Sequence, residues 1–272
     1  MKWDTYNTLS IKSKYLYRYV SLEKLLHFLR TGTLYFSRMD RFEDNLEGIV
    51  PSEITKLIFN MFPVPPKEER NSVISDEEWG QIEYNGVQNL RNLQETLRVK
   101  QKKSFVSCWF LGNTESIGMW DLYAKEGFLI RFDRKNLQKL VKSKIKKQSI
   151  QHEETDLLVA GKVKYQDFQQ IPLKEKESSI IYSGFRKHEA FKHEEEYRFI
   201  LHKSNPLDDG LEYNLEEIDN LDFKLFTNPR MSTFTYNAYS DLLTKYTLKH
   251  KLNESMLKQW LEFKNMNFKN HE

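Results

Sequence analysis

The sequence predicts an α+β protein with a single mixed or antiparallel sheet as its core, surrounding helices and one helical insertion. Short apolar segments with the alternation typical of strands occur from residue 15 to residue 227, and helical segments lie between them. The 272 residues suffice for one large core, so we expect a single domain over residues 1–272, with the insertion at residues 51–103.

Composition limits the function classes. Hydrophobic residues make up 39% of the chain, and 18 Phe and 14 Tyr predict a core built mainly from large rings. Lys and Arg total 42 against 39 Asp and Glu, a net charge of +3. This balance is too even to argue for nucleic-acid binding by bulk charge alone, so any basic surface must be local.

The single cysteine, Cys108, excludes an intramolecular disulfide and any site built from several thiolates. No run of about 18 apolar residues occurs, and the N-terminus lacks a signal-peptide pattern, so we expect a cytoplasmic protein. The histidines show no metal-ligand spacing, and we expect no histidine metal site.

Residues 15–20 predict the first strand, and a helix capped by Ser21 follows it. Arg18 shares a strand face with Leu16 and Val20, whereas the tyrosines occupy the other face. A guanidinium on an apolar face must be paired, bind a ligand, or extend its head to water. Arg18 is therefore a candidate site residue and the expected long-range counter-charge of the carboxylates described below.

A second strand is expected at residues 34–37, and an acidic loop at residues 42–48 follows it. Asp44 and Glu47 in this loop are oxygen donors that suit a metal or a sugar, or they cap the next element. From residue 51 to residue 103 the sequence first contains several prolines and then becomes polar with a helical pattern, and this change predicts the insertion.

Residues 104–110 form the clearest predicted strand, apolar on both faces as in the centre of a sheet. Ser107 is expected either to be satisfied by the backbone or to contact a ligand. Cys108 on the opposite face is expected to be a small core residue and not a nucleophile.

A helix at residues 118–123 and a strand at residues 128–132 lead to a basic helix from Arg134 to Lys147. Its apolar stripe should pack on the sheet, and its cationic face is either simply solvated or binds nucleic-acid phosphates. The cationic residues are Arg134, Lys135, Lys139, Lys142, Lys144, Lys146 and Lys147.

At residues 193–201 several ionisable residues are followed directly by an apolar segment. A helix is expected before it, at residues 175–191. As a strand, this segment places Glu194, Glu196 and Arg198 on one face and Tyr197 on the other. The two glutamates either lie at a solvated strand end with Arg198 as a surface partner, or form a carboxylate pair at a cleft. An acidic loop at residues 205–220, a strand at 223–227 and a helix at 235–248 complete the predicted order.

These motifs together resemble a large bacterial family known only as a domain of unknown function, DUF2971. Phe191 stands where that family usually has Trp and Leu46 where an aromatic residue is common, and both substitutions keep an apolar residue. The family implies no activity, although a role in phage defence or in a toxin system would fit it. The matching positions are Tyr17-Arg18-Tyr19, residues 42–47, Ser107-Cys108-Trp109, Met119-Trp120 with Tyr123, residues 127–133, Lys187, Phe191, Glu194-x-Glu196-Tyr197-Arg198 and Pro229-Arg230-Met231.

The order of Arg18, Ser107 and Glu194-x-Glu196 is also similar to that of arginine-specific ADP-ribosyltransferases. This resemblance implies that the arginine contacts the phosphates of NAD, the serine seats the nicotinamide ribose, and Glu196 holds the ribose hydroxyl. It implies an ADP-ribosyltransferase-like fold, NAD as the cofactor and an unknown macromolecule as the acceptor. On this basis the catalytic candidates are Glu196 and Glu194, and the NAD-binding candidates are Arg18, Ser107, Tyr17, Tyr197 and Arg198.

Two alternatives belong to other classes. A metal-dependent nuclease or phosphodiesterase would use Asp44, Glu47, Glu194 and Glu196 as ligands for Mg²⁺. A non-enzymatic nucleic-acid or protein-binding module would use the basic helix, and the glutamates and Arg18 would then form a buried ion-pair network.

Overall fold

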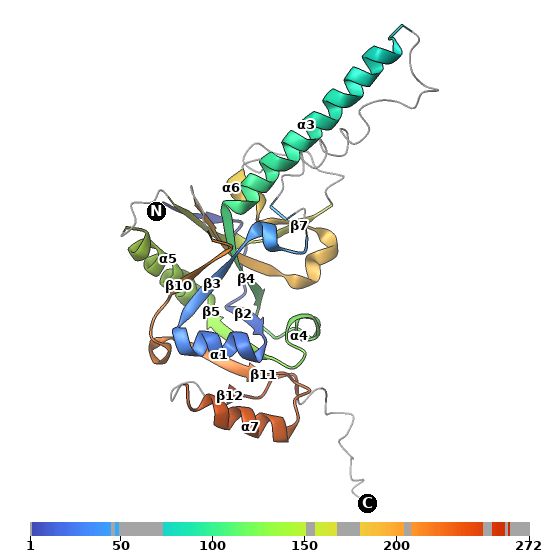
Figure 1. Ribbon diagram of the computed structural model, residues 1–272. Helices are drawn as coiled ribbons and strands as arrows, with labels where there is room; N and C mark the ends of the chain where they lie inside the picture. Colours follow the sequence, from blue (N-terminus) through green and yellow to red (C-terminus); the bar gives the residue numbers. More distant parts are fainter. Residues whose placement is uncertain are drawn as a thin grey trace, which may run out of the picture.

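The computed structural model describes residues 2–44, 47–48, 73–150, 156–167, 180–203, 208–246, 252–258 and 261. Within these residues ten strands form one large sheet, and helices lie around it (Figure 1). The α+β class is confirmed. The sheet is mixed, because β1 pairs with β6 and β11 pairs with β12 in parallel, whereas the other pairs of this sheet are antiparallel.

The strands across the sheet run in the order β1-β6-β9-β4-β2-β5-β11-β12, and β3 pairs with both β4 and β10. Two further strands, β7 and β8, form a small parallel pair. The strands are β1 (Lys2–Tyr6), β2 (Tyr15–Val20), β3 (Thr33–Arg38), β4 (Ser104–Gly112), β5 (Phe128–Asp133), β6 (Leu157–Lys162), β7 (Lys164–Gln166), β8 (Arg186–His188), β9 (Glu196–His202), β10 (Gly210–Asn214), β11 (Phe223–Thr227) and β12 (Leu252–Asn253).

Strand β4 changes partners along its length. Residues 110–112 pair with residues 15–17 of β2, whereas Phe105 and Val106 pair with the end of β3. Beyond Tyr17, β2 continues along β5 and leaves β4. Within the described residues, the middle of β4 therefore has no strand partner on this side, and the sheet opens between β2 and β3.

The helices cover the sheet, except that α3 projects away from it (Figure 1). The predicted apolar stripe of α5 is confirmed, since Leu137, Val141 and Ile145 are fully buried, and Asp133 accepts hydrogen bonds from the backbone amides of Lys135 and Asn136. The helices are α1 (Leu22–Thr31), η1 (Met39–Arg41), α3 (Asp76–Lys102), α4 (Ile117–Tyr123), α5 (Arg134–Ile150), α6 (Ile180–Ser183), η4 (Glu189–Glu194), η5 (Ile218–Asn220) and α7 (Thr233–Leu243).

Helix α3 lies in the predicted insertion, of which residues 51–72 are outside the described part. Ser75 begins it with a capping box, in which its hydroxyl accepts from the amide of Glu78 and the Glu78 carboxylate accepts from the amide of Ser75. None of the described helices has both the length and the apolar character needed to span a bilayer.

The expected helix at residues 175–191 is wrong in its second half. Residues 186–188 form β8 because they pair with β7, and a 3-10 turn follows, so long-range pairing outweighs the local helical preference. Besides β8, strands β1, β10 and β12 were not predicted, and β12 pairs with β11. Strand β1 pairs with β6 at the sheet edge, and β10 in the predicted acidic loop pairs with β3.

Candidate functional site

A cleft of about 1000 Å³ lies where the sheet opens between β2 and β3. Its lining comes from both faces of the sheet. Cys108 and Phe110 of β4 lie on the face that carries Glu196 and Arg198, whereas Trp109 belongs to the opposite face with Phe132. The cleft therefore passes through the opening in the sheet.

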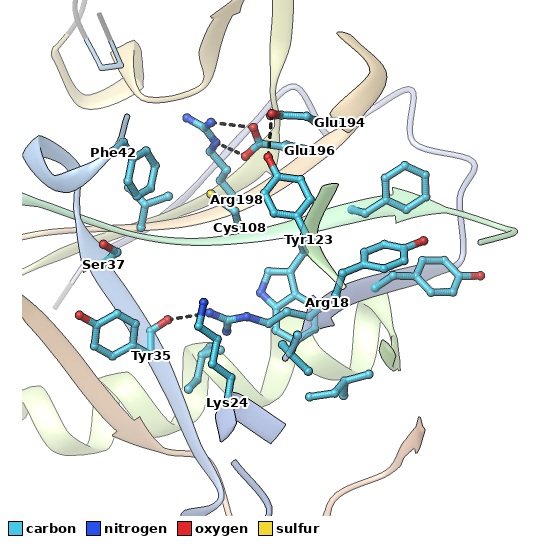
Figure 2. Close-up of a pocket in the computed structure, with 18 of the residues that line it drawn as sticks. Arg18, Lys24, Tyr35, Ser37, Phe42, Cys108, Tyr123, Glu194, Glu196 and Arg198 are labelled. Atoms are coloured by element: carbon cyan, nitrogen blue, oxygen red, sulfur yellow. Dashed lines mark hydrogen bonds and ion pairs between the residues drawn. The ribbon is translucent and has the colours of Figure 1, made fainter. Parts of the chain in front are cut away.

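Arg18 is the cation at the centre of this cleft (Figure 2). Its guanidinium donates hydrogen bonds to Ser107 Oγ at 3.3 Å and to the backbone carbonyl of Tyr35 at 3.5 Å, and it lies 5.5 Å from the centre of the Trp109 ring. Burial lowers the pKa of Arg18. Among the described residues, no carboxylate forms an ion pair with it, so Arg18 does not meet the glutamates directly.

Ser107 is fully buried beneath Arg18 and does not line the cleft. Its hydroxyl oxygen also accepts a hydrogen bond from Trp109 Nε1 at 3.2 Å. Ser107 therefore positions the guanidinium and the indole, and a ligand in the cleft does not reach it directly.

Arg198 is completely buried, and the sequence-based alternative that it is a surface partner is wrong. It forms a bidentate pair with Glu196, with Nε 2.7 Å from one carboxylate oxygen and Nη2 2.8 Å from the other. Its remaining nitrogen, Nη1, donates to Glu47 and to the carbonyl of Gly184, the latter at 2.7 Å. Arg198 is thus the structural counter-charge of Glu196.

Lys187 is the second cation of this cluster. Its ammonium lies 2.5 Å from Glu194 and 3.1 Å from Glu196, and 4.6 Å above the ring of Phe191. Tyr123 donates its hydroxyl to the other oxygen of Glu194 at 2.9 Å. Tyr123 is 51% exposed, so Glu194 is hydrogen-bonded to a side chain that reaches the surface, although its own side chain is only 7% exposed, as is that of Glu196 (Figure 2).

The pKa values of the two glutamates are shifted in opposite directions. Burial raises the pKa of Glu194 to about 7, and the neighbouring Glu196 carboxylate adds to the rise although Lys187 opposes it. Burial would also raise the pKa of Glu196, but the charge and hydrogen bonds of Arg198 outweigh it and hold that pKa well below its usual range. Glu196 is therefore a fixed anion, and Glu194 exchanges a proton near neutral pH.

The backbone brings the two glutamates together by a route that the sequence did not predict. Glu194 ends the 3-10 helix η4, and β9 begins only at Glu196. Glu195 between them has a left-handed conformation, with φ 39°. This turn, and not strand alternation, directs both side chains into the same cluster.

Tyr17 lines the cleft, and its role in ligand binding stays a prediction. Tyr197 does not line it, because its ring is fully buried on the other face of β9 and its hydroxyl accepts a hydrogen bond from Gln138. Cys108 lines the cleft, but burial and the Glu196 carboxylate raise the pKa of its thiol, so it is not a ready nucleophile.

Residues 119–199 match the model of a family described as "Protein of unknown function (DUF2971)". The predicted DUF2971 resemblance is confirmed. No curated protein matches the chain, and no solved structure does. The DUF2971 segment contains Tyr123, Lys187, Glu194, Glu196 and Arg198, so it supplies most of the charged cluster. Arg18, Ser107 and Glu47 come from outside that segment.

Sequence reasoning missed Lys187 and Tyr123 as site residues, although both are positions of the DUF2971 pattern. It placed Glu47 among candidate ligands of a metal or a sugar, or as a cap of the next element, and not as a partner of Arg198. That metal site gains no support, because Arg198 and Lys187 already neutralise Glu47, Glu194 and Glu196, and no metal-ligand cluster of three or more side chains occurs among the described residues. Asp44 also lines the cleft.

The basic helix α5 lies on the face opposite to Glu196, with Lys135, Lys139, Lys142, Lys146 and Lys147 exposed. Lys144 forms an ion pair with Glu216 at 2.6 Å, and the Lys142 ammonium lies 5.1 Å from the centre of the Trp3 ring. Nucleic-acid binding by this helix stays a prediction.

Proposed function

We propose that the protein is an ADP-ribosyltransferase-like enzyme that binds NAD in the cleft and transfers ADP-ribose to a macromolecule. The observation that carries this proposal is Arg18, a cation directed into the cleft with no carboxylate partner among the described residues. A half-buried charge of this kind is costly unless an anion approaches it, and the planar guanidinium suits a diphosphate.

The wall of the cleft suits the uncharged parts of a nucleotide. Aromatic rings from several separate elements line it, including Tyr19 of β2, Phe110 of β4, Tyr123 of α4 and Phe191 of η4. Flat rings of this kind pack against bases and riboses over a large area.

Glu194 is better suited than Glu196 to act on the ribose. Arg198 and Lys187 occupy the oxygens of Glu196, whereas Glu194 pairs with Lys187 alone among the cations of the described residues and is hydrogen-bonded to the half-exposed Tyr123. In the proposed reaction the bond between nicotinamide and the ribose carbon breaks, and nicotinamide leaves with the bonding electrons. The Glu194 carboxylate stabilises the positive charge that develops on the ribose. The acceptor then forms a bond to the same carbon, and Glu194 takes the proton that the acceptor loses.

The test compares NAD binding and nicotinamide release for the purified wild-type protein and a Glu194→Gln variant, with and without cell extract. We expect Glu194→Gln to keep the fold and NAD binding and to lose at least about 100-fold in release, the usual scale for a lost acid–base group. Glu189→Gln, at an exposed glutamate on the same 3-10 helix, is the matched control and should retain activity.

Glu196→Gln is a less informative variant, because it breaks the bidentate pair with the buried Arg198 and should lower stability. Two results would exclude the enzyme: no heat of binding with NAD in calorimetry, or no nicotinamide release even with cell extract.

A further inference from the structure

The residues that line the cleft belong to opposite faces of the sheet, and we call the part of the cleft beside each group a compartment. The carboxylate compartment contains Tyr123, Glu194 and the cluster around Arg198. The second, which we name the α1 compartment, lies between α1, β3 and β5. Its lining residues are His27, Phe28, Thr33, Leu34, Phe132 and Leu215.

The α1 compartment has an apolar floor and a polar rim. Phe28, Leu34, Phe132 and Leu215 form the floor, and each is at most 9% exposed. At the rim, His27 Nε2 lies 3.0 Å from Glu212 Oε1, with side chains 41% and 45% exposed. A flat apolar ring fits against such a floor, and hydroxyl or amino groups on its edge can hydrogen-bond to the rim.

Arg18 joins the two compartments. Its side chain leaves β2 on the face of Leu16 and Val20, which is the face of the α1 compartment. The hydrogen bonds to Ser107 and to the Tyr35 carbonyl hold its guanidinium at the opening of the sheet. In the view of Figure 2, Arg18 lies below the carboxylate cluster and above Lys24. An anionic group bound there leaves room for a substituent on either side.

We infer that the α1 compartment binds the second nucleoside of a dinucleotide, so that the cleft selects dinucleotides over mononucleotides. The diphosphate would then lie at Arg18, with the reacting ribose in the carboxylate compartment. This inference rests on the proposed function, because only that proposal places the reacting ribose near Glu194. A volume of about 1000 Å³ lies at the upper end of small-molecule sites and accommodates both halves.

The experiment measures the affinities of NAD, ADP-ribose and nicotinamide mononucleotide by calorimetry, for the wild type and for a His27→Ala/Glu212→Ala double variant. Both positions are half-exposed, so the fold should survive, and a thermal melt checks this. We expect the wild type to bind NAD at least tenfold more tightly than the mononucleotide. The double variant should lose at least fivefold for NAD and ADP-ribose and stay within twofold for the mononucleotide.

Two further variants complete the design. His27→Trp fills the rim instead of emptying it and should give the same selective loss. Arg30→Ala, at an exposed position of the same helix outside the cleft, is the matched control and should change no affinity.

The outcomes separate the two proposals. Equal affinity for NAD and the mononucleotide, or equal losses for both ligands in the variants, would overturn the α1 compartment as a nucleoside site and leave NAD binding intact. Failure of all three ligands to bind would overturn the proposed function and this inference together.

Discussion

Arg198 and Arg18 line the same cleft but should respond in opposite ways to the same substitution, Arg→Met. Arg198 is completely buried and donates to Glu196, Glu47 and a backbone carbonyl. Arg198→Met leaves the buried carboxylates of Glu196 and Glu47 with Lys187 as the remaining cationic partner among the described residues. Breaking a buried ion pair in this way lowers the free energy of unfolding by about 3–5 kcal/mol. Because Lys187 still pairs with both carboxylates, we expect a loss near the lower end of this range.

Arg18→Met removes a cation that has no ion pair among the described residues and only two long hydrogen bonds, at 3.3 and 3.5 Å. Each such bond contributes about 1 kcal/mol or less, and relief of the buried charge offsets part of that loss. We therefore expect the free energy of unfolding to change by at most about 1 kcal/mol. NAD binding, in contrast, should fall at least tenfold.

The assay is urea unfolding, followed by tryptophan fluorescence and circular dichroism at fixed pH and salt concentration. Equal losses of stability in the two variants would mean that Arg18 is a structural cation, and the case for an anion site would fail. A loss below about 1 kcal/mol for Arg198→Met would refute the network reasoning itself.

Three further predictions concern single features of the cleft and of the basic helix. The pKa of Glu194 is about 7 in the folded protein, against 4.5 in the unfolded chain, so the folded state binds this proton more tightly. Protonated Glu194 therefore stabilises the fold below about pH 4.5, and this stabilisation is lost as pH rises to about 7. At about 1.4 kcal/mol per pKa unit, the loss of stability is about 3 kcal/mol, and screening by water in the cleft reduces it to about 1–2 kcal/mol. Urea unfolding midpoints measured between pH 5 and pH 8 should depend less on pH in Glu194→Gln than in the wild type. Tyr123→Phe removes a donor to Glu194 from a half-exposed side chain, so nicotinamide release should fall about tenfold with an unchanged melting temperature, and an unchanged rate would exclude a role for the hydroxyl. Lys142→Glu with Lys146→Glu tests the basic helix: salt-dependent binding of RNA or DNA that is lost in this variant would favour the nucleic-acid module.

The faces of the central strands could be read from the sequence. Alternation placed Arg18 with Leu16 and Val20, and Arg198 with Glu196, because a strand repeats every two residues wherever it lies in a sheet. The stripe of α5 was equally predictable, since one turn of helix fixes which residues share a face. These features depend only on the backbone within a single element.

Tertiary structure decided which charges meet. Lys187 lies on β8, a strand that forms only through pairing with β7, and Glu47 reaches Arg198 across 151 positions of sequence. The opening of the sheet likewise depends on β4 pairing first with β2 and then with β3, a choice of partners that no local pattern encodes. Thus the sequence by itself determined that Arg18 lies on an apolar strand face and that Glu196 shares a face with Arg198. Only the long-range pairing of strands, which brings distant segments together, decided that Arg198 neutralises Glu196 while Arg18 is left facing the cleft.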